Sequence, residues 1–287
     1  MPVIMANGLQ THYYDDNLSA PWRAAEPVWI QHGFGRNANF WWQWVAPLAG
    51  TYRVLRRDLR GHGGSAAPDP KHVWQVEDLL QDMVAFLDGL KIERVHYVGE
   101  SVASILGIAF ATTYPKRFAS MTLVGALTQV YPRVQKIFSQ DYPDFPTAVR
   151  KLTPGGWAKG LALRGGTSSK GWSPTKSAQN QDPAETQWML QEWSRTPTEA
   201  LAGLAELATR ANVESLLEKV STPTLILAAP NSNITTLQEQ VVMRERIPTC
   251  KILVIDGPDH EIYFNRTDDC IAAVRPFLAA HPIARST

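Results

Sequence analysis

Hydrophobic positions along the chain show two kinds of spacing, one typical of strands and one typical of helices. In residues 1–127, short apolar runs of strand length alternate with longer stretches whose apolar residues recur at helical spacing. The runs at 28–31, 52–57 and 95–98 are typical of buried strands, whereas 76–90 carries its apolar side chains on one helical face. This alternation favours an α/β fold with a mostly parallel central sheet flanked by helices.

The pattern changes between residues 128 and 214. Strand-like runs are missing there, and helical segments alternate with breaks rich in Pro, Gly and Ser, such as TPGGW and RGGTSSKGWSP. The first pattern returns in 215–287, with apolar runs at 224–229 and 251–255. We therefore predict an α/β core formed by 1–127 and 215–287, with a helical cap, or lid, inserted at 128–214.

Composition and charge narrow the class of protein. The chain has 287 residues, 44% of them hydrophobic, and a formal net charge of +1, which gives no electrostatic reason to bind nucleic acid. Its two cysteines are too few for a disulfide framework, and this indicates a reducing compartment. The N-terminal segment lacks signal-peptide features, and no stretch approaches the ~18 apolar residues of a membrane span. We expect a cytoplasmic monomer or homodimer that acts on a small-molecule substrate and binds no membrane.

Polar motifs follow four of the predicted strands. They are HGFG at 32–35, DLRGHG at 58–63, GES at 99–101 and GPDH at 257–260. The carboxyl ends of parallel strands meet at one edge of a sheet, where α/β proteins build their sites. The four motifs are therefore predicted to share one site.

Ser101 lies in the stretch VGESVAS, between a predicted strand and a predicted helix. Gly99 and Ala103 flank it, and both are small enough for a tight strand-to-helix turn. The helix N-terminus favours negative charge beside the serine, so we predict a nucleophile rather than a helix N-cap. The glycines around Phe34 let its N–H turn inward, and with the N–H of Val102 it is predicted to form an oxyanion hole.

His260 follows the last predicted strand in the GPDH motif. Of the seven histidines it alone is both late in the chain and at the carboxyl end of a strand. An imidazole there can reach Ser101 and take its proton, so we predict that His260 is the general base. No His, Cys or carboxylate cluster has the spacing of metal ligands, and neither a metal nor a cofactor is expected.

The motifs HGFG, RDLRGHGGS, VGESVAS and GPDHEIYF, in this order, resemble those of the α/β-hydrolase fold superfamily. The resemblance spans nearly the whole chain and is nearest to small esterases, enol-lactonases and carbon–carbon bond hydrolases. It implies the same roles for Ser101, His260 and the oxyanion loop. It also implies that Asp58 and Arg60 belong to a structural turn and take no part in the chemistry.

The same resemblance implies a third member, a carboxylate that orients the histidine. It should follow the strand at 224–229, but the chain reads AAPNSNIT there, which places Asn231, Ser232 and Asn233 at the position. Counting forward from this strand, or back from His260 by the family's usual spacing, places the acid at Ser232. The alternative place in the family, after the preceding strand, holds Gly-Ala at 125–126 and is also without an acid.

Two other carboxylates lie near in sequence. Asp259 precedes His260, and adjacent side chains rarely point at one another; Glu100 precedes Ser101 and is expected to brace the turn from behind. Three explanations stay open. The site is a Ser–His dyad oriented by one of the three polar residues, or a carboxylate from elsewhere such as the cap completes it, or it serves another end.

Aromatic residues indicate an apolar pocket. Two of the three tryptophans in FWWQW are expected in the core, and the third, with tryptophans of the cap, would favour an aromatic or alicyclic ester or lactone. An arginine in this region is a candidate partner for a substrate carboxylate, or else a surface residue. The predicted pocket residues are Gly33, Arg36, Trp41, Trp157 and Trp188.

Three functions compete. The first is a serine hydrolase of a carboxylic ester or lactone, with acyl transfer at Ser101; hydrolysis of a carbon–carbon bond is a variant that uses the same residues. The second is a cofactor-free oxygenase or lyase in which His260 deprotonates the substrate. The third is a ligand-binding protein with a degenerate site, which the intact serine, histidine and oxyanion loop disfavour.

Overall fold

The computed structural model describes residues 2–164 and 183–283. Within them one sheet has the strand order β1-β2-β4-β3-β5-β6-β7-β8, in which β1 and β2 pair antiparallel and β3 to β8 run parallel. The central strands β5 and β6 are buried along their whole length because helices cover both faces of the sheet. The strands are β1 (Val3–Ala6), β2 (Leu9–Asp16), β3 (Glu26–Gln31), β4 (Tyr52–Arg57), β5 (Val95–Glu100), β6 (Phe118–Val124), β7 (Thr224–Ala228) and β8 (Cys250–Val254).

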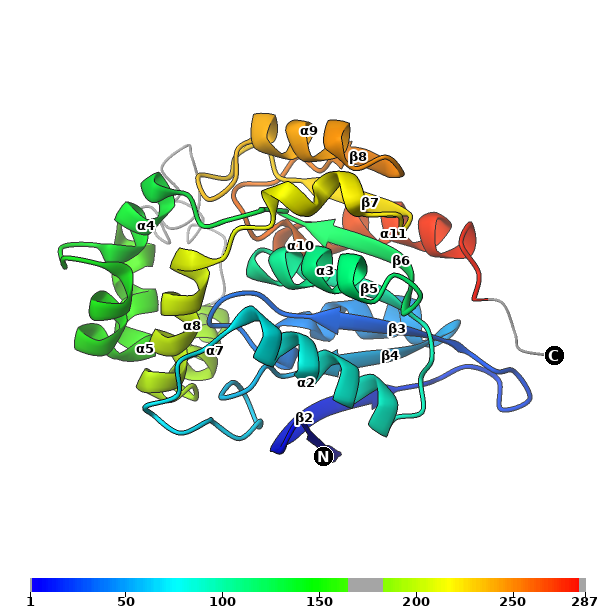
Figure 1. Ribbon diagram of the computed structural model, residues 1–287, viewed down its shortest axis with the longest axis horizontal. Helices are drawn as coiled ribbons and strands as arrows, with labels where there is room; N and C mark the ends of the chain where they lie inside the picture. Colours follow the sequence, from blue (N-terminus) through cyan, green and yellow to red (C-terminus); the bar gives the residue numbers. More distant parts are fainter. Residues whose placement is uncertain (1, 165–182, 284–287) are drawn as a thin grey trace.

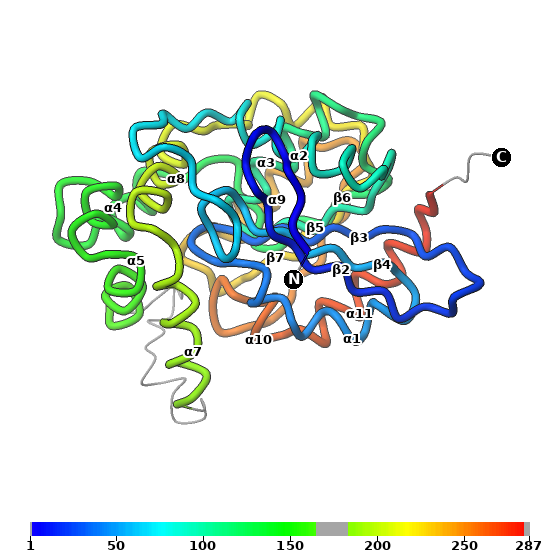
Figure 2. The backbone as a smooth tube through the Cα atoms, turned by 90° about the horizontal axis from the view of Figure 1, so that it is seen from below, coloured from blue at the N-terminus to red at the C-terminus, as the bar shows by residue number. Residues whose placement is uncertain are grey.

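Helices α2, α3 and α9 cover one face of the sheet, and α1, α10 and α11 cover the other (Figure 2). Helix α3 is buried on nearly every side, which explains its almost wholly apolar sequence. The predicted α/β fold is confirmed. The bounds are η1 (Ala38–Trp44), α1 (Val45–Ala49), α2 (Val76–Gly89), α3 (Val102–Thr113), η2 (Glu214–Lys219), α9 (Leu237–Arg246), α10 (Ile262–Asn265) and α11 (Thr267–Ala279).

Between β6 and β7 the described chain is helical. Helices α4, α5, α7 and α8 pack together beside the carboxyl ends of the strands, at the left of Figure 1. An isolated bridge between Gln129 and Asn212 joins the two ends of this helical insertion. We propose that the insertion is the cap predicted at 128–214, of which 165–182 lie outside the described residues. The bounds are α4 (Pro132–Ser139), α5 (Phe145–Leu163), α7 (Pro183–Ser194) and α8 (Thr198–Arg210).

The tryptophans of η1 divide as predicted. Trp41 and Trp44 are fully buried, whereas Trp42 is 57% exposed. The Trp41 ring stacks on Tyr263 of α10 with ring centroids 4.4 Å apart, and this contact ties η1 to the loop that carries His260. In the part of the chain that the structure describes, no helix is long and apolar enough to cross a membrane.

Candidate active site

Ser101 lies at the turn between β5 and α3 in a strained backbone conformation. Its φ is 54° and its ψ is −121°, values that a residue with a side chain rarely adopts. The turn requires small neighbours, because a Cβ at Gly99 would come within 2.6 Å of the Tyr97 ring. Ala103 is fully buried, and its carbonyl accepts a hydrogen bond from the Tyr97 hydroxyl. The structure therefore has the elbow geometry expected of a presented serine, with alanine serving where a second glycine is usual.

His260 is buried beside this elbow. Its Nδ1 lies 3.0 Å from the Ser232 hydroxyl, and its Nε2 lies 3.6 Å from Oε1 of Glu100. Nε2 has no hydrogen-bond partner among the described residues. Burial lowers the pKa of His260 to about 4; the charge of Glu261 acts in the opposite sense, and that of Arg36 lowers the pKa further.

Ser232 is the residue of the 231–233 loop that contacts the histidine. Asn231 points elsewhere, since its amide donates to the carbonyl of Gly257 at 2.6 Å, and Asn233 is half-buried in the same loop. At the alternative acid position, 125–126, Gly125 has no room for a side chain, because a Cβ there would come within 2.7 Å of Cε1 of His260. The position that the sequence count reached is therefore filled by a hydroxyl.

The oxyanion loop is closely packed at its two glycines, against the elbow at Gly33 and against α7 at Gly35. A Cβ at Gly33 would collide with the Glu100 carboxyl, and one at Gly35, where φ is 68°, would collide with Trp193 of α7. Val102 is the first residue of α3, so its N–H has no acceptor within the helix. Phe34 and Val102 thus lie on the two segments that the predicted oxyanion hole requires.

A family model described as the alpha/beta hydrolase fold matches residues 26–267. The chain belongs to the α/β-hydrolase fold family. A curated relative, 3-oxoadipate enol-lactonase 1 of Acinetobacter baylyi, is 26% identical over 242 residues, 81% of each chain. The 2-hydroxy-6-oxo-2,4-heptadienoate hydrolase of Pseudomonas putida is 32% identical over 128 residues, 44% of each chain. The predicted enzyme class, a hydrolase of esterase or lactonase type, agrees with this membership.

Two solved structures show the same fold. The enol-lactonase of Burkholderia xenovorans superposes with a TM-score of 0.83 at 22% identity, covering 97% of this chain and 100% of the other. A thermophilic esterase of Thermogutta terrifontis superposes with a TM-score of 0.80 at 22% identity, covering 98% and 99%. At this identity the likeness concerns the fold, which the described residues share from end to end.

In this α/β hydrolase a charged cluster lies beneath the oxyanion loop. Oε2 of Glu100 accepts a hydrogen bond from the Gly33 N–H at 2.9 Å. Burial, with a further contribution from Glu261, raises the pKa of Glu100 to about 8, although Arg36 acts in the opposite sense. Arg36, predicted to meet a substrate carboxylate, is paired with Glu261 at 2.6 Å and lies over the Trp193 ring. Its charge is therefore already balanced inside the protein.

Asp259 has turned away from the histidine that follows it. Its Oδ1 accepts hydrogen bonds from the N–H of Glu261 at 2.8 Å and from the amide of Asn265 at 3.0 Å. Burial raises the pKa of Asp259 to about 7. Among the residues that the structure describes, Glu100 thus has the carboxyl that contacts the ring of His260, a position that the sequence pattern alone did not reveal.

Aromatic rings of the helical insertion pack on the oxyanion loop. The Phe34 ring lies 4.8 Å from that of Phe145 and 5.5 Å from that of Trp157, centroid to centroid. Trp188 instead packs on Phe40, at 5.0 Å, near the start of η1. The predicted pocket residues therefore do not lie together. Trp157 belongs to the cluster around Phe34, whereas Trp41 is a core residue.

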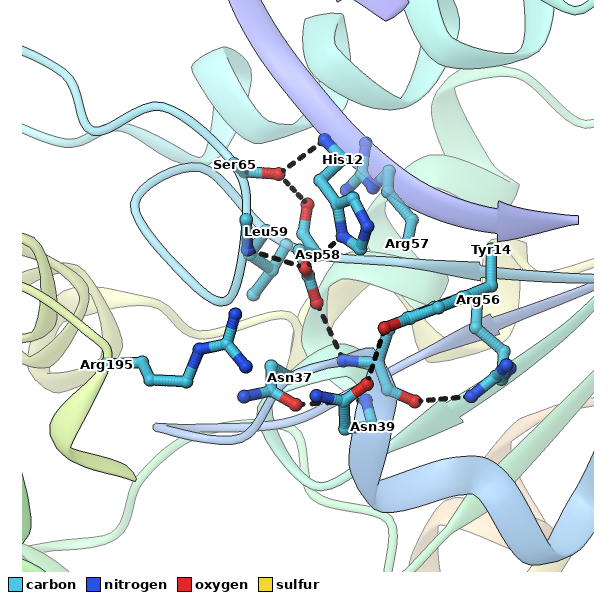
Figure 3. Close-up of polar contacts among 12 residues, drawn as sticks. His12, Tyr14, Asn37, Asn39, Arg56, Arg57, Asp58, Leu59, Ser65 and Arg195 are labelled. Atoms are coloured by element: carbon cyan, nitrogen blue, oxygen red, sulfur yellow. Dashed lines mark hydrogen bonds and ion pairs between the residues drawn. The ribbon is translucent and has the colours of Figure 1, made fainter. Parts of the chain in front are cut away.

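The DLRGHG motif forms a buried turn, and Figure 3 shows the polar contacts around its Asp58. The Asp58 carboxylate accepts hydrogen bonds from the N–H groups of Ala38 and Gly64, and it lies 2.6 Å from Nδ1 of His12. Arg60 pairs with Asp82 of α2 at 2.7 Å. These contacts tie the turn to β2, η1 and α2, in keeping with the structural role that the family resemblance implied.

Proposed function

We propose that the protein is a serine hydrolase of a carboxylic ester or lactone, with Ser101 as the nucleophile. The observation that carries the proposal is the strained backbone of Ser101 at the strand-to-helix turn. Strain of this kind persists only where the surrounding structure enforces it, and it clusters at active sites. The enol-lactonase and esterase relatives support the class of bond that is cleaved.

The reaction follows from the arrangement of the groups. The Ser101 Oγ attacks the carbonyl carbon, and its proton passes to the buried pair formed by His260 and Glu100. The N–H groups of Phe34 and Val102 stabilise the oxyanion. The carbon–oxygen bond of the substrate then breaks, the leaving oxygen takes the proton, and water hydrolyses the acyl-enzyme by the same steps. For a lactone the leaving oxygen stays attached to the acyl chain.

An apolar or aromatic acyl or alcohol group suits this site. The insertion presents the rings of Phe138, Phe145 and Trp157 to Phe34, and Trp193 extends the cluster. Aromatic rings bind aromatic and alicyclic groups through large apolar contact areas. Carbon–carbon bond hydrolysis is a second candidate, since a relative that is a heptadienoate hydrolase matches 44% of the chain at 32% identity.

A fluorophosphonate probe tests the nucleophile. Intact mass should show one adduct on the wild type and none on Ser101→Ala. Ser104→Ala is a matched control, because Ser104 is a fully buried serine of α3 three positions further along, and it should label like the wild type. An unlabelled wild type contradicts the proposal. Oxygen consumption with aromatic hydroxyl substrates would then support the oxygenase alternative, and saturable binding without turnover would support a ligand-binding protein.

A further inference from the structure

The hydrogen bonds of Ser232 decide where the proton of His260 resides. A hydroxyl has one proton and two lone pairs. The Ser232 Oγ accepts hydrogen bonds from the backbone N–H groups of Ile234 and Thr235, each at 3.1 Å. Both lone pairs are therefore engaged by groups that can only donate. The remaining contact, 3.0 Å to Nδ1 of His260, must use the hydroxyl proton. Ser232 is the donor and Nδ1 is the acceptor.

A neutral imidazole whose Nδ1 accepts a hydrogen bond carries its proton on Nε2. A histidine that takes the proton of a serine needs the opposite tautomer, with Nε2 free. An acid in the place of Ser232 enforces that tautomer, because a carboxylate only accepts hydrogen bonds. The serine enforces the reverse, so in the resting enzyme Nε2 presents an N–H toward the elbow.

Protonation of His260 is also disfavoured. A charged imidazolium would direct Nδ1–H at an oxygen whose lone pairs are already engaged by Ile234 and Thr235. The ring is only 2% exposed, so water cannot replace the missing acceptor. The histidine is thus placed as a hydrogen-bond donor rather than as a base.

Glu100 offers the acceptor that His260 lacks. It is the residue before Ser101 in the chain, and its side chain is turned to the histidine, with Oε1 3.6 Å from Nε2. Its other oxygen, Oε2, is fixed by the N–H of Gly33 at 2.9 Å. Oε1 is thereby left facing Nε2 of the ring, on the residue that directly precedes Ser101 in the chain.

Building on the proposed function, we propose that Glu100 accepts the proton of Ser101, while His260, held by Ser232, keeps its Nε2 proton and donates a hydrogen bond. The carboxylate takes the proton from Oγ as the Oγ–carbon bond forms, and it returns this proton to the leaving oxygen as the carbon–oxygen bond breaks. In the second half a water molecule gives its proton to Glu100, which passes it back to the Ser101 Oγ. Whenever Glu100 is ionised, the Nε2–H of His260 donates a hydrogen bond to its carboxylate.

The tautomer is tested by ¹⁵N NMR of the histidine side chains, with the His260 resonances assigned by His260→Gln. The wild type should show the proton on Nε2, and Ser232→Asp should move it to Nδ1. This measurement needs no substrate and does not depend on the proposed function. A wild-type ring protonated on Nδ1 overturns the inference even if the aspartate variant fails to fold.

The role of Glu100 is tested by Glu100→Gln in two backgrounds. Glutamine keeps an acceptor for the Gly33 N–H, so if Glu100 only supports the oxyanion loop, the variant should stay active. In the wild type we expect kcat/KM on an aryl ester to fall about 100-fold or more, the usual scale of general base catalysis. In the Ser232→Asp background, where His260 becomes the base, the same change should cost less than about tenfold.

Asp259→Asn is the matched control, since Asp259 is a buried carboxyl next to His260 that does not contact its ring, and kcat/KM should change less than about threefold. Equal losses from Glu100→Gln in both backgrounds would show a bracing role only and overturn the inference. If the fluorophosphonate probe does not label Ser101 of the wild type, the proposed hydrolase function itself is contradicted. The two failures are therefore distinguishable.

Discussion

At Gly125 the backbone itself makes room for the histidine. This glycine has a φ of 55°, a left-handed conformation that side chains disfavour, and its Cα faces the imidazole edge. A Cβ there would lie 2.7 Å from Cε1 and 3.0 Å from Nδ1 of His260. Neighbouring β6 and β7 fix the backbone, so the ring would have to move instead.

Gly125→Ala should therefore displace His260 and weaken its bond to Ser232. We expect a loss of about 1–2 kcal/mol in the free energy of unfolding, from the strained backbone and the contact together. Activity on an aryl ester should fall about tenfold or more, since small displacements of reacting groups are costly. Gly50→Ala is the control, because Gly50 has an ordinary φ of −69° and open space around it. A Gly125→Ala variant with wild-type kcat/KM contradicts this prediction.

The pH dependence of kcat/KM distinguishes the two candidate bases. Glu100 accepts a proton only when ionised, and its pKa of about 8 reflects burial and Glu261, opposed by Arg36 and the Gly33 N–H. The rate should therefore rise with pH and level off above about 8. A base with the pKa of His260, about 4, would give a flat profile across the neutral range. A flat profile from pH 6 to 9 would thus contradict the role given to Glu100.

At the scale of elements, a buried carboxylate joins helix α7 to the start of η1, which follows the oxyanion loop. Oε2 of Glu192 accepts hydrogen bonds from the side-chain amides of Asn37, at 2.8 Å, and Asn39, at 2.9 Å. Arg195 directly follows the last residue of α7 and pairs with the same carboxylate at 3.2 Å. Figure 3 shows Asn37, Asn39 and Arg195 beside the Asp58 turn. The insertion is thus anchored to η1 by charge-assisted hydrogen bonds and to the oxyanion loop by aromatic rings.

Glu192→Ala should loosen this anchor. Hydrogen bonds to a buried charge contribute about 1.5–3 kcal/mol, and the free energy of unfolding should fall by about that amount. Since α7 would pull away from η1, KM should rise more than kcat falls. Glu199→Ala is the control, because Glu199 makes an exposed ion pair with Arg150 in the same insertion and should cost less than about 1 kcal/mol. Equal effects of the two changes, measured by urea unfolding, would contradict the anchor.

At the scale of the whole molecule, the reactivity of the two buried cysteine thiols measures how readily the folded structure opens. Cys250 lies in the edge strand β8 and Cys270 in helix α11, and both are free and buried. Burial raises the pKa of each thiol to about 12, so neither carries an appreciable thiolate population at neutral pH. Their reaction with a thiol reagent therefore requires the surrounding structure to open.

The native protein should be inert to a disulfide reagent at pH 8 on the timescale of minutes, and both thiols should react in denaturant. Edge strands open more readily than packed helices, so Cys250 should react first. The single variants Cys250→Ser and Cys270→Ser assign the two phases. Rapid reaction of Cys270 in the folded protein would show that α11 detaches on its own.

The sequence by itself predicted the fold, which the family match confirms, and it proposed the first two members of the site. Apolar periodicity reports which face of each element is buried, so it predicted the parallel sheet, the helical insertion and two core tryptophans in FWWQW. The motifs at strand ends predicted Ser101 and His260, because parallel strands bring their carboxyl ends to one edge. Small residues around the serine also follow from local sterics, which a few neighbouring residues decide.

Only the tertiary structure decided which group faces each nitrogen of the histidine. Three polar residues stand in a row at 231–233, and their order in the chain does not fix which of them turns to His260. The pairing of Arg36 with Glu261 and the approach of Glu100 to Nε2 likewise join segments far apart in sequence. Such contacts depend on the packing of the whole core, whereas proton positions follow from the hydrogen bonds that this packing leaves possible.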